Sequence, residues 1–369
     1  MMRRSDGVID FGKSPKNLIP TDQNRCEQPF AVFHNLFANV FMKLRIGLIG
    51  LGDGWQTRHR PALRMLHDRF DVRAVFSPVA KLAENSASEF QADAVDGYRT
   101  LVSRCDIDAV MVLQGSWLGW LPILAASEAG KAIYWAGNLD FDPEKDQHVR
   151  DTIEQSGVAF MAEFPRRFAP ATLRLRELIA THLGAPQLIF CHHRTPSPSN
   201  ERRQQTKHDR SEFIELIDWC RYVVNREPVH VASTCHQLDE TSGYRSLSLD
   251  FAATEKLPAV TAQISSGNYI QQSWQEAIGF RPPSAMQICC ERGIAFVDLP
   301  SNLVWFDGAG RHLESLETEL PVGEQLLTQF HRAVTSLLRN MSDLNDAYRA
   351  ASIFSAAQQS ESTGRRIAV

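Results

Sequence analysis

The sequence predicts an α/β protein that begins with a doubly wound parallel sheet and continues into an α+β domain with an open, mostly antiparallel sheet. Over residues 43–163, short apolar runs alternate with segments whose apolar residues recur every three or four positions. Such alternation is typical of parallel strands joined by helical crossovers. From residue 164 onward, one helix is followed by a series of predicted strands with a single further helix among them.

In the first domain, the run LRIGLIG at residues 44–50 is typical of a buried parallel strand. The remaining elements follow the same two patterns. Strands are predicted at residues 71–76, 108–113, 132–135 and 158–164, and helices at residues 58–69, around Leu82, Ala83 and Phe90, and at residues 121–129 and 143–156.

In the second domain, residues 164–369, a helix at residues 169–182 precedes strands that are separated by glycine turns. A helix at residues 211–224 interrupts the strands, and two helices close the chain. The strands are predicted at residues 187–193, 229–237, 244–251, 259–265, 286–290 and 294–298.

Composition excludes several classes of function. A net charge of −4 gives no reason to expect nucleic acid or an acidic membrane as a partner. No apolar stretch reaches the roughly 20 residues that cross a bilayer. The seven cysteines are scattered without a C-x-x-C pair, so we expect no metal site but buried free thiols in a reducing cytoplasm. Residues 1–42 lack periodicity, and we expect a disordered extension or a start upstream of the natural one, with Met42 directly before the first strand.

A glycine turn follows the first predicted strand and precedes the first predicted helix. Gly50 and Gly52 occupy the first two places of G-x-G-x-x-G, while Trp55 occupies the third and implies a reshaped or lengthened turn. The placement predicts a Rossmann domain that binds the pyrophosphate of NAD or NADP at a helix N-terminus. The predicted cofactor-binding residues are Gly50, Gly52, Gly54, Trp55, Ser77, Gln114 and Asn138.

The second strand ends without the acid that usually binds the ribose hydroxyls, because the sequence there is Phe76-Ser77-Pro78. Two interpretations stay open. Ser77 with Arg58, Arg60 or Lys81 would suit the 2′-phosphate of NADP, or no residue holds that ribose closely.

Several phrases carry a family resemblance over residues 43–369. They are Gly50-Leu51-Gly52 with HRPAL at residues 59–63, DIDAV at residues 106–110, AASEAGK at residues 125–131, RFAP at residues 167–170, DWCRY at residues 218–222 and the tail from residue 355. In these phrases the chain resembles the Gfo/Idh/MocA oxidoreductases. The resemblance implies NAD(P)-dependent oxidation or reduction of a sugar, polyol or related carbohydrate. It also implies a homodimer or homotetramer formed through the open face of the second sheet.

The chain departs from this family where the chemistry is expected. The family's catalytic lysine corresponds to Gly137, and its catalytic acid and histidine correspond to Ser211 and Glu215. Removing a hydroxyl proton needs a group with a suitable pKa. Glu215 would serve if apolar surroundings raised its pKa, and His208 is a second candidate. The alternative for Glu215 is a solvated residue on an amphipathic helix.

Three residues are candidates for substrate contact, namely Arg167, His193 and Lys207. Lys207 lies in a basic segment, residues 194–210, which is predicted to be a loop that closes over an acidic ligand, or else a solvated loop or subunit contact. Ion pairing at the domain interface is the alternative for Arg167. A structural role is the alternative for His193, and tryptophans 117, 120 and 135 would stack on a ligand or pack in the core.

Two hypotheses about function follow from this pattern. One is an oxidoreductase with rearranged acid and base groups. The other is a non-catalytic NAD(P)-binding sensor or regulatory protein of the same fold, which the simultaneous replacement of the proton-handling positions favours. The fold does not separate them, because activity resides in the site.

Overall fold

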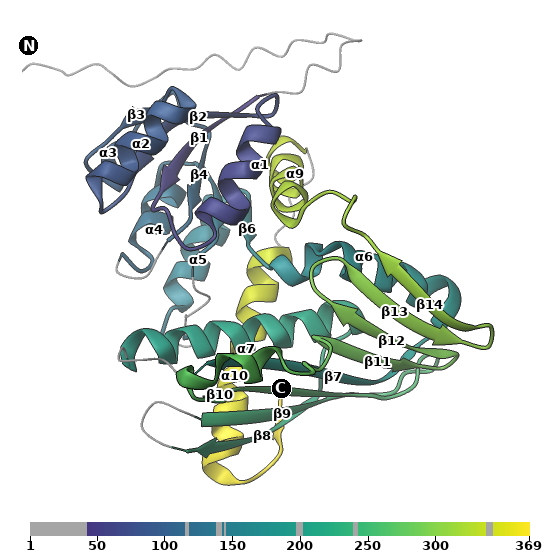
Figure 1. Ribbon diagram of the computed structural model, residues 1–369. Helices are drawn as coiled ribbons and strands as arrows, with labels where there is room; N and C mark the ends of the chain where they lie inside the picture. Colours follow the sequence, from purple (N-terminus) through teal and green to yellow (C-terminus); the bar gives the residue numbers. More distant parts are fainter. Residues whose placement is uncertain are drawn as a thin grey trace, which may run out of the picture. The chain divides into compact units, whose positions relative to one another are not determined.

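The first sheet of the computed structural model has six parallel strands in the order β3-β2-β1-β4-β5-β6 (Figure 1). The central position of β1 and the crossovers on either side of it define a doubly wound sheet, which confirms the predicted fold class. The strands are β1 Leu44–Ile49, β2 Phe70–Phe76, β3 Asp93–Ala94, β4 Ala109–Val112, β5 Ala132–Trp135 and β6 Phe160–Ala162.

The structure describes residues 43–114, 118–137, 142–143, 145–196, 202–238, 243–336 and 342–369, and these lie in one compact unit. The predicted N-terminal extension, residues 1–42, lies outside them. The helices between the strands of the first sheet are η1 Trp55–His59, α1 Arg60–Met65, α2 Ala80–Phe90, α3 Tyr98–Val102, α4 Leu121–Glu128 and α5 Gln147–Ser156.

The second sheet has nine strands in the order β14-β13-β12-β11-β7-β10-β9-β8-β15. Among the described strands of this sheet, β7 and β10 form the one parallel pair, so the sheet is mostly antiparallel, as predicted. Its strands are β7 Pro186–Pro196, β8 His230–Gln237, β9 Gly243–Phe251, β10 Val260–Ile270, β11 Met286–Cys290, β12 Gly293–Asp298, β13 Asn302–Asp307, β14 Gly310–Ser315 and β15 Ile367–Ala368.

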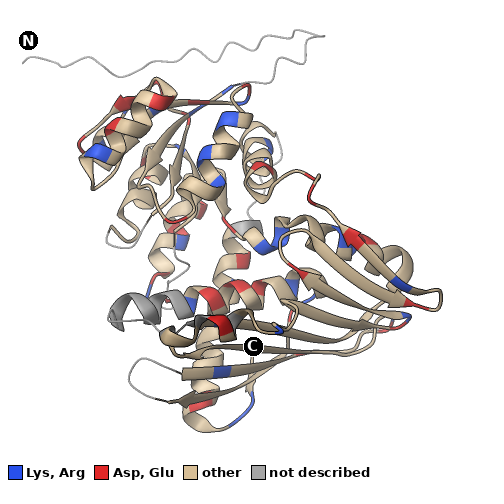
Figure 2. Ribbon diagram, viewed as in Figure 1, with Lys and Arg blue, Asp and Glu red and all other residues tan. Residues whose placement is uncertain are grey.

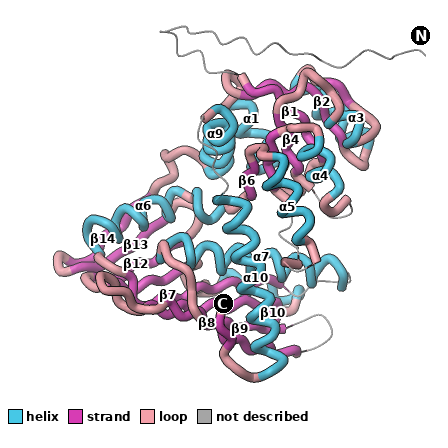
Figure 3. Tube along the Cα trace, turned by 180° about the vertical axis from the view of Figure 1, so that it is seen from behind, coloured by secondary structure: helices cyan, strands magenta, loops and turns pink. Residues whose placement is uncertain are grey.

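Helices of the second half cover one face of this sheet. The long helices α7 and α10 contact each other, and they pack on β10 and β8 respectively (Figure 3). Alternation along the strands directs Leu247, Leu249 and Ile264 toward these helices, where they are buried. The helices are η2 Pro165–Phe168, α6 Pro170–Leu178, η3 Ile179–Leu183, α7 Arg202–Val224, η4 Gln272–Trp274, α8 Gln275–Gly279, α9 Val322–Thr335 and α10 Ser342–Thr363.

Helix α9 returns to the first sheet, although it follows the whole second sheet in the sequence. The ribbon in Figure 1 and the tube in Figure 3 both place it beside α1. Leu326, Leu327 and Phe330 are fully buried there in the same apolar cluster as Tyr134 and Met161. The final part of the chain therefore completes the core of the Rossmann half.

The predicted loop at residues 194–210 is wrong in most of its length. Residues 194–196 extend strand β7, and residues 202–210 are the first turns of α7. The segment RRQQTKHDR contains residues of good helix propensity and no breaker, but it lacks the apolar stripe by which a helix is recognised.

The expectation of buried thiols holds for only part of the cysteines. Cys191, Cys220 and Cys290 are buried, but Cys105 and Cys235 are exposed. Within the described ranges, no helix combines the length and the apolar character that crossing a bilayer requires.

Candidate functional site

The turn after β1 is tight enough to require glycine at two positions. Gly50 has a φ of +75°, and its N–H donates to Phe76 O at 2.8 Å. A Cβ on Gly52 would lie 2.4 Å from Leu113 O, and one on Gly50 would lie 2.8 Å from the Gln114 Cβ. The backbone therefore passes directly over the end of β4 before the helix begins at Trp55. This is the local geometry that a pyrophosphate-binding turn needs.

Trp55 occupies the third motif position and changes the start of the helix. Residues Trp55–His59 form a π-helical turn that continues into α1, which confirms the predicted reshaping. The indole is 4% exposed and packs 6.0 Å from the Phe90 ring of α2. Its side chain is thus part of the core beside the turn.

At the end of β2, Ser77 is buried, and its Oγ accepts a hydrogen bond from Val79 N at 3.3 Å. Two of the three basic residues proposed for a 2′-phosphate are engaged elsewhere. Arg58 binds Glu163 at 2.7 Å, and Arg60 binds Glu89 at 2.8 Å. The third, Lys81, is largely exposed and lies 3.3 Å from Glu84.

Glu215 lies in a cluster of charged residues where η2 meets α7. Arg166 forms ion pairs with both Glu215 and Glu212. Burial raises the pKa of Glu215, whereas the charges of Arg166 and Arg58 oppose that rise. The surroundings of Glu215 are thus charged and not apolar as the sequence-based condition required, although burial still shifts its pKa upward. Figure 2 shows acidic residues along the middle of α7 and basic residues on η2.

His193 joins this cluster, whereas His192 does not. The Nδ1 of His193 lies 3.2 Å from Glu212 Oε1 and 3.3 Å from Ser266 Oγ, on the α7 side of the sheet. The Nδ1 of His192 lies 2.8 Å from Ser265 Oγ on the opposite face, as strand alternation requires. Burial and the charge of Arg194 lower the pKa of His192.

The other predicted site residues fall into three groups. Gln114 borders the glycine turn, as its contact distance to Gly50 shows. Asn138 lies outside the described residues. Lys207 and His208 lie in the first turns of α7, in the part of the helix whose side chains are not described.

Arg167 forms ion pairs inside the protein. It binds Asp218 and also Asp346, at 2.9 Å for the latter, and its side chain is 9% exposed. Its guanidinium also lies 5.2 Å from the centre of the Tyr222 ring. This geometry argues against the predicted substrate contact and for the alternative, ion pairing.

Two of the tryptophans pack on each other. Trp120 and Trp135 stack with ring centres 4.8 Å apart, and Trp135 is buried. Core packing therefore accounts for this pair, and Trp117 lies outside the described residues.

Sequence reasoning missed a buried polar cluster beneath the glycine turn. Glu163 Oε2 lies 2.6 Å from His59 Nε2 and accepts a hydrogen bond from the Tyr134 hydroxyl at 2.7 Å. The available signal was Glu163 itself, the one acid in the otherwise apolar run predicted as a strand at residues 158–164, because an acid buried in a sheet requires partners.

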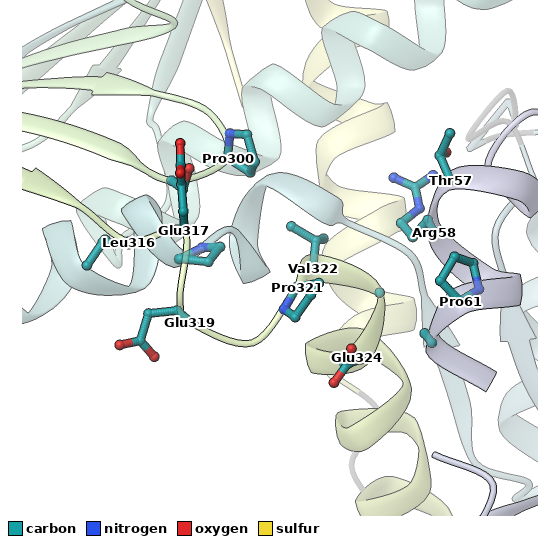
Figure 4. Close-up of a pocket in the computed structure, with 14 residues that line it drawn as sticks. Thr57, Arg58, Pro61, Pro300, Leu316, Glu317, Glu319, Pro321, Val322 and Glu324 are labelled. Carbon is teal, nitrogen blue, oxygen red and sulfur yellow. The ribbon is translucent and has the colours of Figure 1, made fainter. Parts of the chain in front are cut away.

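A pocket of about 430 Å³ lies elsewhere in the molecule (Figure 4). It is bordered by the helix after the glycine turn, the start of α6, the turn at Pro300 and the chain before α9. Of the candidate residues, Arg58 borders this pocket, and the glycines of the turn do not line it. The labelled acids Glu317, Glu319 and Glu324 lie around it.

Comparisons with known proteins agree with this fold and turn. Residues 44–164 match the model of the oxidoreductase family, NAD-binding Rossmann fold, of the Gfo/Idh/MocA type. Inositol 2-dehydrogenase of Cereibacter sphaeroides is 29% identical over 194 residues, which are 51% of this chain and 56% of that enzyme. The match to this curated relative thus spans little more than half of its length.

Solved structures extend the likeness in fold. Levoglucosan dehydrogenase, in complex with NADH and levoglucosan, superposes with a TM-score of 0.72 at 16% identity, over 89% of this chain and 99% of that one. An NAD-binding oxidoreductase from Klebsiella pneumoniae gives a TM-score of 0.72 at 16% identity, again over 89% and 99%. At these identities the likeness concerns the fold.

The protein class is therefore an NAD-binding Rossmann domain joined to an open-sheet domain. Residues 44–164 match the NAD-binding domain of the Gfo/Idh/MocA oxidoreductases, and the resemblance predicted from the sequence is confirmed over this range. NAD or NADP is the cofactor that this domain indicates.

Proposed function

We propose that this protein is an NAD(P)-dependent oxidoreductase that acts on a sugar, polyol or related carbohydrate. The observation that carries the proposal is the glycine turn at Gly50 and Gly52, which has the shape of a pyrophosphate-binding turn. The dehydrogenase relative acts on inositol according to its name, which supports a polyhydroxylated substrate.

The residues of the turn fit the cofactor. The glycines let the backbone approach a pyrophosphate, and Gln114 borders them at the end of β4. Asn138, after β5, is proposed from the sequence to complete the site. When bound, the nicotinamide exchanges a hydride with the carbon that carries the reacting hydroxyl.

Glu215 is our candidate for the group that holds the hydroxyl proton. Its raised pKa brings proton affinity nearer to neutral pH, which improves a general base. Arg166 holds the carboxylate in position and neutralises charge when the proton leaves. His193 and Glu212 stand beside it as candidates for hydroxyl recognition. His208 and Lys207 remain candidates from the sequence.

The test combines nucleotide titration with a turnover screen. Purified protein is titrated with NADH and NADPH, then assayed against sugars and inositols in both directions. We expect binding of at least one nucleotide and turnover of at least one polyol. Glu215→Gln should lower kcat by about 10²-fold or more, the scale of a lost general base, whereas Glu84→Gln at the surface should not.

Each outcome has one interpretation. Tight nucleotide binding without turnover of any compound would favour the sensor. Turnover unchanged in Glu215→Gln would remove Glu215 from the mechanism. Absence of binding by either nucleotide would contradict the cofactor assignment itself.

We also propose a cytoplasmic homodimer or homotetramer that pairs through the face of the second sheet opposite α7 and α10. Strand alternation directs Ser248, Gln263 and His192 to this face, and the first two share a hydrogen bond of 3.1 Å. Multi-angle light scattering would give the size. Ser248→Arg would place like charges across a two-fold interface and should yield monomers. An unchanged mass would argue against this face.

A further inference from the structure

Glu163 is a buried carboxylate to which the proposed mechanism assigns no role. It follows the last strand of the first sheet, and its side chain is 4% exposed. Burial alone would raise its pKa, but the charges of His59 and Arg58 and the Tyr134 hydroxyl hold the pKa below its ordinary value. A buried acid that stays ionised needs partners for both oxygens, and Glu163 has them.

These partners come from separate parts of the first domain. Arg58 and His59 belong to the π-helical turn after the glycines, and Tyr134 belongs to β5. Arg58 Nη2 binds Glu163 Oε1 at 2.7 Å, while His59 and Tyr134 meet Oε2. One carboxylate thus joins the ends of β5 and β6 to the start of the first helix.

The glycine turn rests directly on two of these side chains. A Cβ on Gly54 would lie 2.8 Å from Arg58 Nη2 and 3.0 Å from His59 Cε1. Among the described residues, His59 Nδ1 has no hydrogen-bond partner, so Glu163 alone orients the ring by hydrogen bonding. Any rearrangement of Arg58 or His59 would therefore shift the backbone of the turn at Gly54.

Arg58 also connects the turn to the second domain. A Cβ on Gly323 at the start of α9 would lie 2.5 Å from Arg58 O, so Arg58 packs against the chain that follows the second sheet. Its position depends on Glu163, because that ion pair fixes the end of an otherwise long and partly exposed side chain.

We propose that Glu163 is a positioning residue for the dinucleotide, holding Arg58 and His59 so that the Gly50–Gly54 turn keeps its binding shape. This inference rests on the proposed cofactor binding. It requires that loss of the Glu163–Arg58 pair raises the nucleotide Kd even at temperatures where the variant remains folded.

The experiment compares three variants of the full chain by NADH and NADPH titration calorimetry and by thermal unfolding. Glu163→Gln removes the charge at the centre of the cluster. Arg58→Gln breaks the same ion pair from its partly exposed end and leaves His59 and Tyr134 on Glu163. Glu89→Gln is the matched control, because Glu89 binds two basic residues of α1, Arg60 and Arg64, as Glu163 binds two basic residues of η1.

Both Glu163→Gln and Arg58→Gln should raise the nucleotide Kd at least about tenfold, whereas Glu89→Gln should lower Tm and leave the Kd within about twofold. If Glu163→Gln does not fold, Arg58→Gln decides. Wild-type affinity in Arg58→Gln at a temperature well below its Tm would overturn the inference. A purely structural role would make the Kd follow Tm in all three variants, which would also overturn it. Failure of the wild-type protein to bind either nucleotide would instead contradict the proposed function.

Discussion

Arg58 Nη2 lies 2.7 Å from Glu163 Oε1, and this contact joins the helix that follows the glycine turn to the end of strand β6. The two residues are 105 positions apart in the chain. Their ion pair therefore holds the end of the edge strand β6 against the helix after the glycine turn, although the two segments are far apart in the sequence.

The ionisation of Glu163 should make stability depend on acid pH. Its folded-state pKa is below the ordinary value of 4.5. Stability from this group is therefore fully present above about pH 4.5 and is lost as pH falls through the folded pKa. Urea unfolding from pH 3 to 7 should show wild type more stable than Glu163→Gln near neutrality, with the difference shrinking in acid. A difference that stays constant over this range would contradict the assignment.

Glu215 should show the opposite sign, because its pKa is raised in the folded protein. Between its unfolded and folded pKa the native state binds more protons, so stability falls as pH rises through that window. Unfolding of Glu215→Gln should lack this decline. If both proteins give parallel curves between pH 4 and 8, the carboxyl is not perturbed in the predicted direction.

Substitution of Gly52 should weaken nucleotide binding. A Cβ there would meet Leu113 O at 2.4 Å, so Gly52→Ala must displace the turn from the end of β4. We expect a loss of NAD(P)H affinity of at least about tenfold, measured by fluorescence titration. Gly97→Ala is the control, since its Cβ would have 4.0 Å to the nearest atom, Thr100 Oγ1. Equal affinity in both variants would show that the turn does not contact the nucleotide.

The buried pair of Arg167 and Asp218 should contribute to stability. Asp218→Asn leaves the Arg167 guanidinium without its main counter-charge in a site where it is 9% exposed. Breaking a buried ion pair from one side costs about 3–5 kcal/mol. Glu177→Gln, which removes a surface partner of Arg174, should cost less than about 1 kcal/mol. Chemical denaturation measures both, and a similar small cost for each would refute the structural role of Arg167.

Much of the fold could be predicted because it depends on local pattern. Strand β5, Ala132–Trp135, was predicted at its observed bounds, since four buried apolar residues stand between a glycine turn and a second turn. Strand β14 was missed because Leu313 is the one apolar residue in its sequence GRHLES at the sheet edge. Strand β13 was missed although its apolar run, residues 303–306, stands directly before the hairpin turn at Asp307-Gly308. The first turns of α7 were missed for want of an apolar stripe.

The site was less predictable, because it depends on distant pairs. The glycine turn and Glu215 could be named from sequence, but the partner of Glu215 is Arg166, 49 positions earlier. Arg167 looked equally suited to a ligand, yet its buried acids occupy it. Only the three-dimensional arrangement separates two adjacent arginines with such different neighbours.

The most direct test of the central claim is calorimetric titration of the wild-type protein with NADH and NADPH at neutral pH. We predict saturable binding, with Kd values for the two nucleotides that differ by less than about tenfold. Ser77 stands where an acid would repel the 2′-phosphate of NADPH, and Arg58 and Arg60, which could attract it, pair with Glu163 and Glu89. Absence of saturable binding by both nucleotides would contradict the assignment of the Gly50–Gly54 turn as a cofactor site.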